Sequence, residues 1–222
     1  MTARTPDITL VLGNKAYSSW SLRPWLALKR TGVPFAEVVI PLRRPETKGA
    51  ILEHSPAGKV PVLRHGDRTV WDSLAIIEYL AETFPSARLW PEDANARAVA
   101  RAVSAEMHSG FQALRKALPM DLKARHPGRT FDAEVEADIA RIRSLWEDCR
   151  RRFGADGPFL FGRFSAADAM YAPVVTRFDT YAVTLDPVSR AYADAILTLP
   201  EMREWTAAAM AEPWAIDFGP AP

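Results

Sequence analysis

The sequence predicts a compact α/β domain followed by an all-α domain. A strand, a helix and a second strand follow one another within about 35 residues near the start, which indicates a βαβ unit with parallel strands. A hairpin and another helix come next, so the order is β-α-β-(α)-β-β-α. From Glu92 the β pattern disappears and apolar residues recur at helical spacing. A chain of 222 residues can bury the cores of two modest domains that share an interface.

Short runs of β-branched and other apolar residues mark the predicted strands. The first covers residues 8–13 and the second covers residues 35–40. Residues 61–71 read as a β-hairpin with its turn at Gly66-Asp67. The polar residues 41–50 between these parts predict a loop that runs into an irregular short helix.

Two helices complete the first domain. Apolar residues recur at i, i+3 and i+4 from Leu22 onward, which is typical of an amphipathic helix. Proline is best tolerated in the first helical turn, so Pro24 predicts that this helix begins near Ser21. Gly32 is expected to end it as a C-cap. The second helix is expected from about Ser73 to Phe84.

The predicted domain boundaries are residues 1–85 for the α/β domain, 86–91 for a linker and 92–222 for the all-α domain. In the linker, Leu89 and Trp90 are apolar enough to plug into the interface between the domains. Helices are expected in the second domain at 93–118, 132–153, 166–182, 188–197 and 200–211.

Residues Ser165 to Asp168 form a helix-start motif in the second domain. A serine N-cap with an acidic residue three positions later is a capping box, and an apolar residue precedes it. We interpret this motif as a determinant of folding and not of chemistry.

Composition excludes several classes of function. The net charge is +1, from 28 Lys and Arg against 27 Asp and Glu, which gives no footprint for nucleic acid. No apolar run approaches the roughly 18 residues of a membrane span, and the N-terminus lacks the apolar segment of a signal peptide. A single cysteine, Cys149, excludes a disulfide framework, a CxxC pair and a cysteine-rich metal site. We therefore expect a cytoplasmic protein without a metal, and Cys149 reads as a small buried side chain.

Val60-Pro61 lies where a strand begins. A proline at strand entry is ordinary, but X-Pro bonds can be cis. A cis bond would turn the N–H and C=O of Val60 away from the sheet. Exposed main-chain groups beside a strand can hold an extended peptide by β-augmentation.

Asp72-Ser73 opens a predicted helix. The simple interpretation is N-capping. The alternative is recognition of an α-amino acid head: free N–H groups and a serine hydroxyl bind a carboxylate, while Asp72 pairs with the ammonium group. Both readings use the same helix start.

Three serines, Ser18, Ser19 and Ser21, precede or open the first helix. They are either caps or donors to a sulfur anion, because hydrogen bonds and a helix N-terminus lower the pKa of a thiol. No G-x-S-x-G elbow is present, so a serine hydrolase is not indicated.

These elements together resemble the glutathione transferase family. The resemblance rests on Ser18-Ser19-Trp20-Ser21, on Pro56 to Pro61, on Asp72 to Leu80 and on the Ser165 capping box, and it spans nearly the whole chain. It implies a thioredoxin-like N-terminal domain, a C-terminal α-helical domain and a homodimer. It also implies a cis Val60-Pro61 bond and glutathione as co-substrate, with no metal.

The resemblance is strongest to the serine-type zeta class, whose pattern is Ser-Ser-Cys-Ser-x-Arg. By that pattern Ser18 is the catalytic serine and Ser19 its neighbour. Trp20 stands where the zeta class has cysteine, which puts maleylacetoacetate in question as a substrate. The remoteness of Cys149 argues against an omega-type thiol transferase.

The same resemblance implies roles for further residues. Lys59 and the Val60-Pro61 main chain would hold the peptide, and Asp72 and Ser73 the γ-glutamyl end. The pocket for a second substrate would be formed by Tyr17, Trp20, Met107, His108, Phe111, Arg115 and Arg177. Some of these residues have simpler interpretations: Met107 and Phe111 could be core packing, and His108 could be a structural histidine. Arg177 could steer an anionic substrate or lie on a solvated face.

The sequence thus predicts transfer of glutathione to a small electrophile, in the context of detoxification. Three alternatives stay open: a zeta-like cis–trans isomerase, a peroxidase that uses the same site, and a module that binds without catalysis.

Overall fold

The computed structural model describes residues 7–218. Its first part is a four-stranded mixed sheet in the order β2-β1-β3-β4. The strands are β1 (Ile8–Gly13), β2 (Ala36–Ile40), β3 (Val62–His65) and β4 (Arg68–Trp71). β1 and β2 are parallel, as the βαβ reading predicted, and β3 pairs antiparallel with both β1 and β4.

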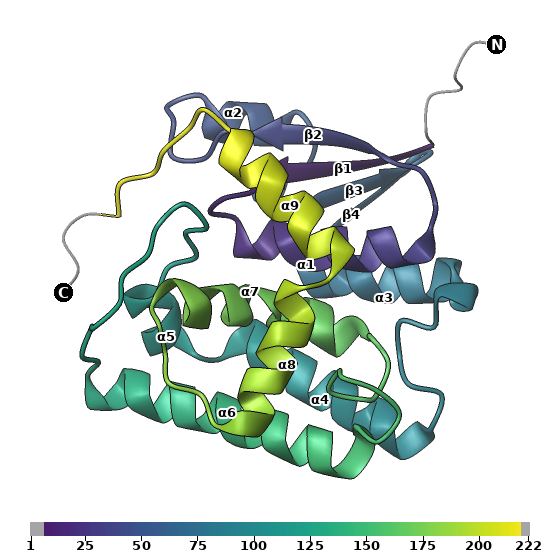
Figure 1. The fold of residues 1–222 in the computed structure, drawn as a ribbon. Helices are drawn as coiled ribbons and strands as arrows, with labels where there is room; N and C mark the ends of the chain where they lie inside the picture. The colour runs from purple at the N-terminus through teal and green to yellow at the C-terminus, as the bar shows by residue number, and fades with distance from the viewer. Residues whose placement is uncertain (1–6, 219–222) are drawn as a thin grey trace.

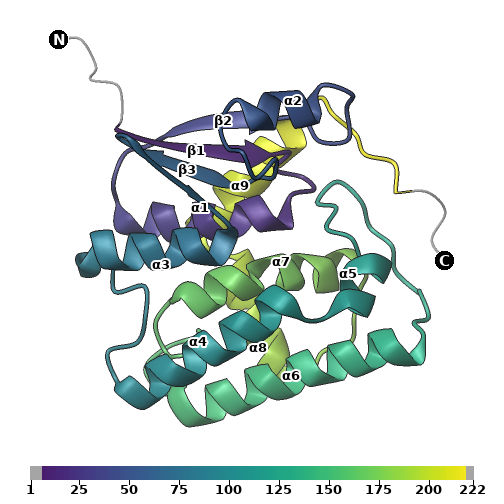
Figure 2. The same cartoon turned by 180° about the vertical axis from the view of Figure 1, so that it is seen from behind.

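Helices cover both faces of this sheet (Figures 1 and 2). α1 (Ser19–Thr31) and α3 (Ser73–Thr83) lie between the sheet and the helical domain, and α2 (Thr47–Leu52) lies on the opposite face. Side chains alternate along a strand, so Leu10 and Leu12 enter the main core while Val11 packs beneath α2. The α/β prediction is confirmed.

The start of α1 differs from the prediction. The helix begins at Ser19, not near Ser21, because the Ser18 hydroxyl caps it by accepting a hydrogen bond from the backbone N–H of Ser21. Pro24 therefore lies in the second turn and leaves the Trp20 carbonyl without its helical donor. The complete burial of neighbouring apolar residues in this turn offsets that lost bond.

The second part is helical (Figure 1). A 3-10 turn, η1 (Pro85–Ala87), leads into it. Its helices are α4 (Ala94–Ser109), α5 (Gln112–Ala117), α6 (Ala133–Phe153), α7 (Ala166–Thr180), α8 (Pro187–Leu197) and α9 (Pro200–Ala211). α7 runs through the middle and contacts α1, α4 and α8.

The predicted single helix over 93–118 is wrong, because the chain breaks between α4 and α5. Gly110 is extended and Phe111 adopts the left-handed conformation, with φ of 61°. Arg115 stabilises this break by donating hydrogen bonds to the carbonyls of Gly110 and Met107. Glycine is a weak helix former, which favours the break at this position.

The interface between the two parts is apolar, and Leu89 and Trp90 are buried in it as predicted. The Trp90 indole donates a 3.0 Å hydrogen bond to Glu78 on α3. The capping box at the start of α7 is also present: the Asp168 carboxylate accepts from the backbone N–H and the hydroxyl of Ser165. Burial raises the pKa of Asp168 to about 6.

Two negative findings apply to residues 7–218. No helix there combines the length and apolar character needed to cross a bilayer. No three His, Cys, Asp or Glu side chains in that range gather closely enough to hold a metal ion.

Candidate functional site

Two hollows meet at the exposed indole of Trp20. The first, here hollow A, has a volume of about 600 Å³ and is lined by Trp20, Ala57, Lys59, Val60, Pro61, Trp71, Asp72, Ser73 and His108. The second, hollow B, has about 630 Å³ and lies where the start of α1 faces α5, α7 and the C-terminal tail. Trp20 borders both hollows and therefore forms the partition between them.

The Val60-Pro61 segment forms one wall of hollow A. Its peptide bond is cis, as the resemblance implied. Pro61 is buried and Val60 half-buried, while Lys59 is exposed at the rim. All three residues line hollow A.

The start of α3 forms the opposite wall. Asp72 is its N-cap, with φ of 75°, and its Oδ1 accepts from the backbone N–H groups of Leu74 and Ala75 at 2.9 and 3.2 Å. Its Oδ2 lies 3.1 Å from Nε2 of His108, so a residue of α4 reaches across to this wall. The Ser73 hydroxyl is buried and has no hydrogen-bond partner among the described residues. An unpaired donor at a helix N-terminus suits an anion.

Ser18 borders neither hollow. Its hydroxyl donates a 2.7 Å hydrogen bond to the Ser21 hydroxyl and accepts one from the Ser21 backbone N–H at 3.3 Å. Ser21 in turn accepts from the Gly13 backbone at 3.0 Å. These hydrogen bonds connect the start of α1 to the end of β1.

Ser19 lines hollow B. Its hydroxyl oxygen accepts a 3.1 Å hydrogen bond from Nη2 of Arg177 on α7. Arg177 is only 4% exposed, so the solvated-face alternative is wrong. Burial, with a contribution from Arg115, lowers the pKa of Arg177 to about 9, which leaves the guanidinium charged at neutral pH.

Two arginine side chains pack against the Trp20 ring. The guanidinium carbons of Arg23 and Arg115 lie 4.4 and 4.8 Å from the Trp20 ring centroid, and the His108 ring meets it edge-on. Arg23 is fully buried, and neither of its terminal nitrogens has a partner among the described residues. Burial lowers its pKa well below the usual range, and the nearby Arg115 and Arg177 add to the effect. Such a cluster attracts negative charge.

The remaining predicted pocket residues divide into two groups. Met107 and Phe111 are buried and border neither hollow, which agrees with the core-packing interpretation. Tyr17 borders hollow B and is hydrogen bonded to the Ile216 backbone, while burial raises its pKa.

Cys149 is buried and lines neither hollow, and burial raises the pKa of its thiol to about 12.

Several residues of hollow B were not singled out from the sequence. Arg43, Lys116, Arg129 and the tail residues 216–218 all line it. They come from four separate segments, so no local motif marks them. Trp71, which lines hollow A, directly precedes Asp72 and could have been included with that motif.

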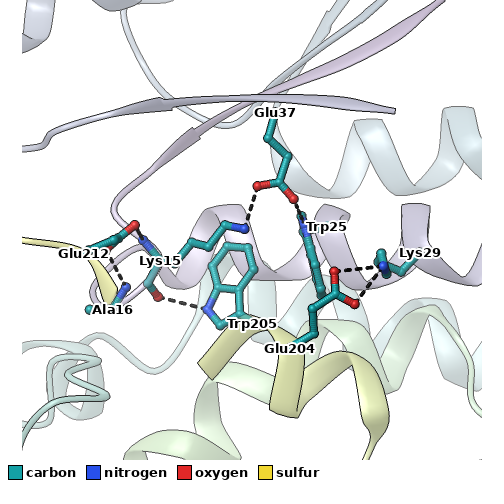
Figure 3. A network of polar contacts seen from close by, with 8 residues as sticks. All are labelled: Lys15, Ala16, Trp25, Lys29, Glu37, Glu204, Trp205 and Glu212. Atoms are coloured by element: carbon teal, nitrogen blue, oxygen red, sulfur yellow. Dashed lines mark hydrogen bonds and ion pairs between the residues drawn. The ribbon is translucent and has the colours of Figure 1, made fainter. Parts of the chain in front are cut away.

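Trp205 on α9 and Glu212 just after α9 position the loop before α1 (Figure 3). The Glu212 carboxylate accepts from the backbone N–H groups of Lys15 and Ala16 at 2.7 and 3.3 Å, and the Trp205 indole donates to the Lys15 carbonyl at 2.9 Å. The Lys15 ammonium pairs with Glu37 on β2 at 2.5 Å. The loop that carries Tyr17 and Ser18 is thereby held from both sides.

A thioredoxin-like α/β domain with this cis-proline wall, joined to an all-α domain, defines the fold of the glutathione transferases. Two models agree: the glutathione S-transferase N-terminal domain matches residues 17–83, and the glutathione S-transferase C-terminal domain matches residues 132–208. The chain belongs to the glutathione S-transferase family.

Individual relatives refine this picture. A probable maleylacetoacetate isomerase of Caenorhabditis elegans is 43% identical over 96 residues, which is 43% of this chain and 44% of that protein. The chain thus matches less than half the length of that relative. Among solved structures, a bacterial maleyl pyruvate isomerase described as a zeta-class glutathione S-transferase gives a TM-score of 0.71 at 27% identity, covering 92% of this chain and 98% of its own.

A glutathione transferase homolog from Burkholderia, with bound glutathione, gives a TM-score of 0.70 at 22% identity and covers 92% and 99% of the two chains. At this identity the similarity is one of fold.

Proposed function

We propose that this protein is a glutathione transferase that conjugates glutathione to a small acidic electrophile. The peptide would lie in hollow A, the thiolate at the Ser18-Ser19 pair, and the electrophile in hollow B. The proposal rests mainly on the position of Trp20, which borders both hollows. Hollow A contains the Val60-Pro61 segment and the unpaired Ser73 hydroxyl at the start of α3, and hollow B is rich in cations.

Hollow A has the groups that a γ-glutamyl peptide requires. The hydroxyl and the backbone N–H of Ser73 would bind the α-carboxylate, because the N–H groups of Leu74 and Ala75 already donate to Asp72. The Oδ2 atom of Asp72 would bind the ammonium group, in the place where it now meets His108. The Val60 main chain and Lys59 would hold the rest of the peptide by β-augmentation and charge.

The chemistry needs a thiolate. A free thiol has a pKa of about 8.5 and is mostly protonated at neutral pH. A serine donor, the N-terminus of α1 and the arginine cluster all favour the charged form, so the thiol would lose its proton to solvent. The sulfur lone pair then forms the new C–S bond. In a substitution the bond to the leaving group breaks and its electron pair departs with that group; in an addition the π bond breaks, its electron pair shifts away from the attacked carbon, and a proton from solvent completes the product.

The charges around hollow B suggest an acidic electrophile. Its lining carries more basic than acidic side chains, with Arg43, Arg115, Lys116, Arg129 and Arg177 against Asp121 and Asp217. A concave site of one sign concentrates ligands of the opposite charge.

A second candidate is glutathione-dependent cis–trans isomerisation. The Caenorhabditis elegans relative and the bacterial structure reported above carry isomerase names, and the arginine cluster would suit a substrate with carboxylates. Trp20, in the place of the zeta-class cysteine, weighs against it. A peroxidase reaction would use the same thiolate with a hydroperoxide acceptor.

Calorimetric titration with glutathione, followed by an activity panel, tests the proposal. We expect saturable binding of glutathione and of S-methylglutathione, and turnover with glutathione alone because the methyl group blocks the sulfur. The panel contains a haloaromatic, maleylacetone and an organic hydroperoxide. Binding without turnover of any acceptor would favour a non-catalytic module, and absence of binding would overturn every glutathione-based function.

Three further attributes are proposals from family membership. They are a homodimer, a cytoplasmic location and a role in detoxification. The buried, single cysteine is compatible with a reducing compartment. Sedimentation of the purified chain would test the dimer.

A further inference from the structure

We propose that Arg177 is a positioning residue that makes Ser19, and not Ser18, the hydrogen-bond donor to the glutathione thiolate. This inference rests on the proposed function and adds a role for a residue of the second domain. Arg177 lies on α7, 158 positions after Ser19, and the two side chains meet at 3.1 Å.

The hydroxyl protons of Ser18 and Ser19 are used differently. Ser18 donates its proton to the Ser21 hydroxyl and its oxygen accepts from the Ser21 backbone. Ser19 instead accepts from Arg177, so its own proton remains free, and within residues 7–218 that proton meets no protein acceptor. Since Ser19 lines hollow B and Ser18 borders neither hollow, Ser19 is the hydroxyl that can donate to a bound sulfur.

Two backbone carbonyls hold the Arg177 side chain in place. Its Nε donates to the Leu118 carbonyl at 2.8 Å and its Nη1 to the Pro173 carbonyl at 3.4 Å, which leaves Nη2 directed at Ser19. No described carboxylate forms an ion pair with Arg177. A buried guanidinium without a counterion favours an anion nearby.

A cation that donates to a hydroxyl oxygen polarises the O–H bond, so the same hydroxyl becomes a stronger donor. The thiol of bound glutathione would lose its proton to solvent, and the resulting thiolate would accept the Ser19 O–H. Arg177 would act through Ser19, with its charge and its geometry, and would not need to touch the sulfur.

Other charged and titratable groups face this site and share the field. They are Arg23 on α1, Arg43 before α2, Arg115 and Lys116 on α5, Asp121, His126 and Arg129 in the α5–α6 connection, Tyr181 after α7, and Tyr17 and Asp217. Arg177 differs from the other cations in bonding directly to a serine hydroxyl at the start of α1.

The test is the pH midpoint of thiolate ultraviolet absorbance for glutathione bound to each variant, with affinity measured in parallel by calorimetry. We expect Arg177→Met and Ser19→Ala each to raise the midpoint by about one pH unit. The double variant should show no further rise, because both changes remove the same donor. Arg177→Lys should restore part of the shift. Arg125→Gln is the matched control. Arg125 is an exposed arginine between α5 and α6, and it pairs with Asp179, which lies on α7 like Arg177.

The inference is overturned if Ser18→Ala raises the midpoint while Ser19→Ala leaves it unchanged, or if the two losses at Arg177 and Ser19 are additive. If Arg177→Met does not fold, the thiolate midpoints of Arg177→Lys and Ser19→Ala test the inference in its place. Failure of the proposed function is distinguishable, since the unmodified protein would then bind no glutathione.

Discussion

The Glu212 carboxylate accepts a 2.7 Å hydrogen bond from the backbone N–H of Lys15, 197 positions earlier in the chain. This bond joins the end of α9 to the loop that precedes α1 (Figure 3). The tail that follows Glu212 then lines hollow B. Residues 216–218 are therefore part of the site, although no motif in them suggests chemistry.

Glu212→Gln should loosen this loop. Loss of charge-assisted hydrogen bonds predicts a fall of about 1–3 kcal/mol in the free energy of unfolding. The KM for the electrophile should rise more than the KM for glutathione, because hollow B depends on the tail and hollow A does not. Urea unfolding and steady-state kinetics measure both effects. The control is Glu204→Gln on α9, because the exposed pair of Glu204 with Lys29 should contribute less than about 1 kcal/mol. Equal losses in the two variants would refute a special role for Glu212.

Asp72→Asn should weaken glutathione binding about tenfold or more, because a charge-assisted hydrogen bond to the ammonium group is lost. The sharper test uses an analogue of glutathione without the amino group. The unmodified protein should prefer glutathione over this analogue, and Asp72→Asn should bind the two almost equally. Asp67→Asn in the hairpin turn is the control. If the variant retained the full preference, the ammonium group would have another partner.

Trp20→Ala should remove two cation–π contacts and expose Arg23. Such contacts contribute about 0.5–2 kcal/mol each, so we expect a loss of about 1–3 kcal/mol in the free energy of unfolding. Trp20→Phe, which keeps an aromatic ring, should recover part of it. Urea denaturation measures these values. An alanine variant as stable as the unmodified protein would show that the stacked arginines do not depend on the indole.

Asp168 gives a pH-dependent prediction. Its pKa is about 6 in the folded protein and about 3.9 in an unfolded chain, so the folded state binds the proton more tightly. The free energy of unfolding attributable to Asp168 should therefore rise as the pH falls from about 6 to about 4. Compared with Asp168→Asn, the unmodified protein should gain about 1–3 kcal/mol over that window in urea unfolding. If the difference in unfolding free energy between the unmodified protein and Asp168→Asn became smaller as the pH falls, the hydrogen bonds from Ser165 and Leu160 would be keeping the carboxylate ionised.

The sequence was sufficient for the fold because its signals are local. The apolar run in β1, the hairpin turn and the Ser165 capping box each act within a few residues, and the structure has all three. The exceptions are also local. Because Ser18 caps α1, the helix begins at Ser19, before the position near Ser21 that Pro24 suggested. Gly110 allows a helix break that apolar periodicity does not reveal.

The candidate site could be predicted only in part. Hollow A is built mainly from two contiguous motifs, around Val60 and Asp72, so the sequence identified most of it. Hollow B is assembled from distant segments, and spacing alone could not separate Met107, which is core, from Arg115, which lines the hollow. The contact of Ser19 with Arg177 depends on how α7 packs against α1, so the serine motif could not show it. The choice of Ser18 came from the resemblance to the zeta pattern.

The most direct measurement is a crystal structure of the protein with glutathione bound. Our account predicts the peptide in hollow A, along the Val60 main chain, with the sulfur within about 3.5 Å of the Ser19 hydroxyl and the Arg177 hydrogen bond intact. A sulfur that contacts Ser18 while Ser19 points away, or a peptide outside hollow A, would contradict it.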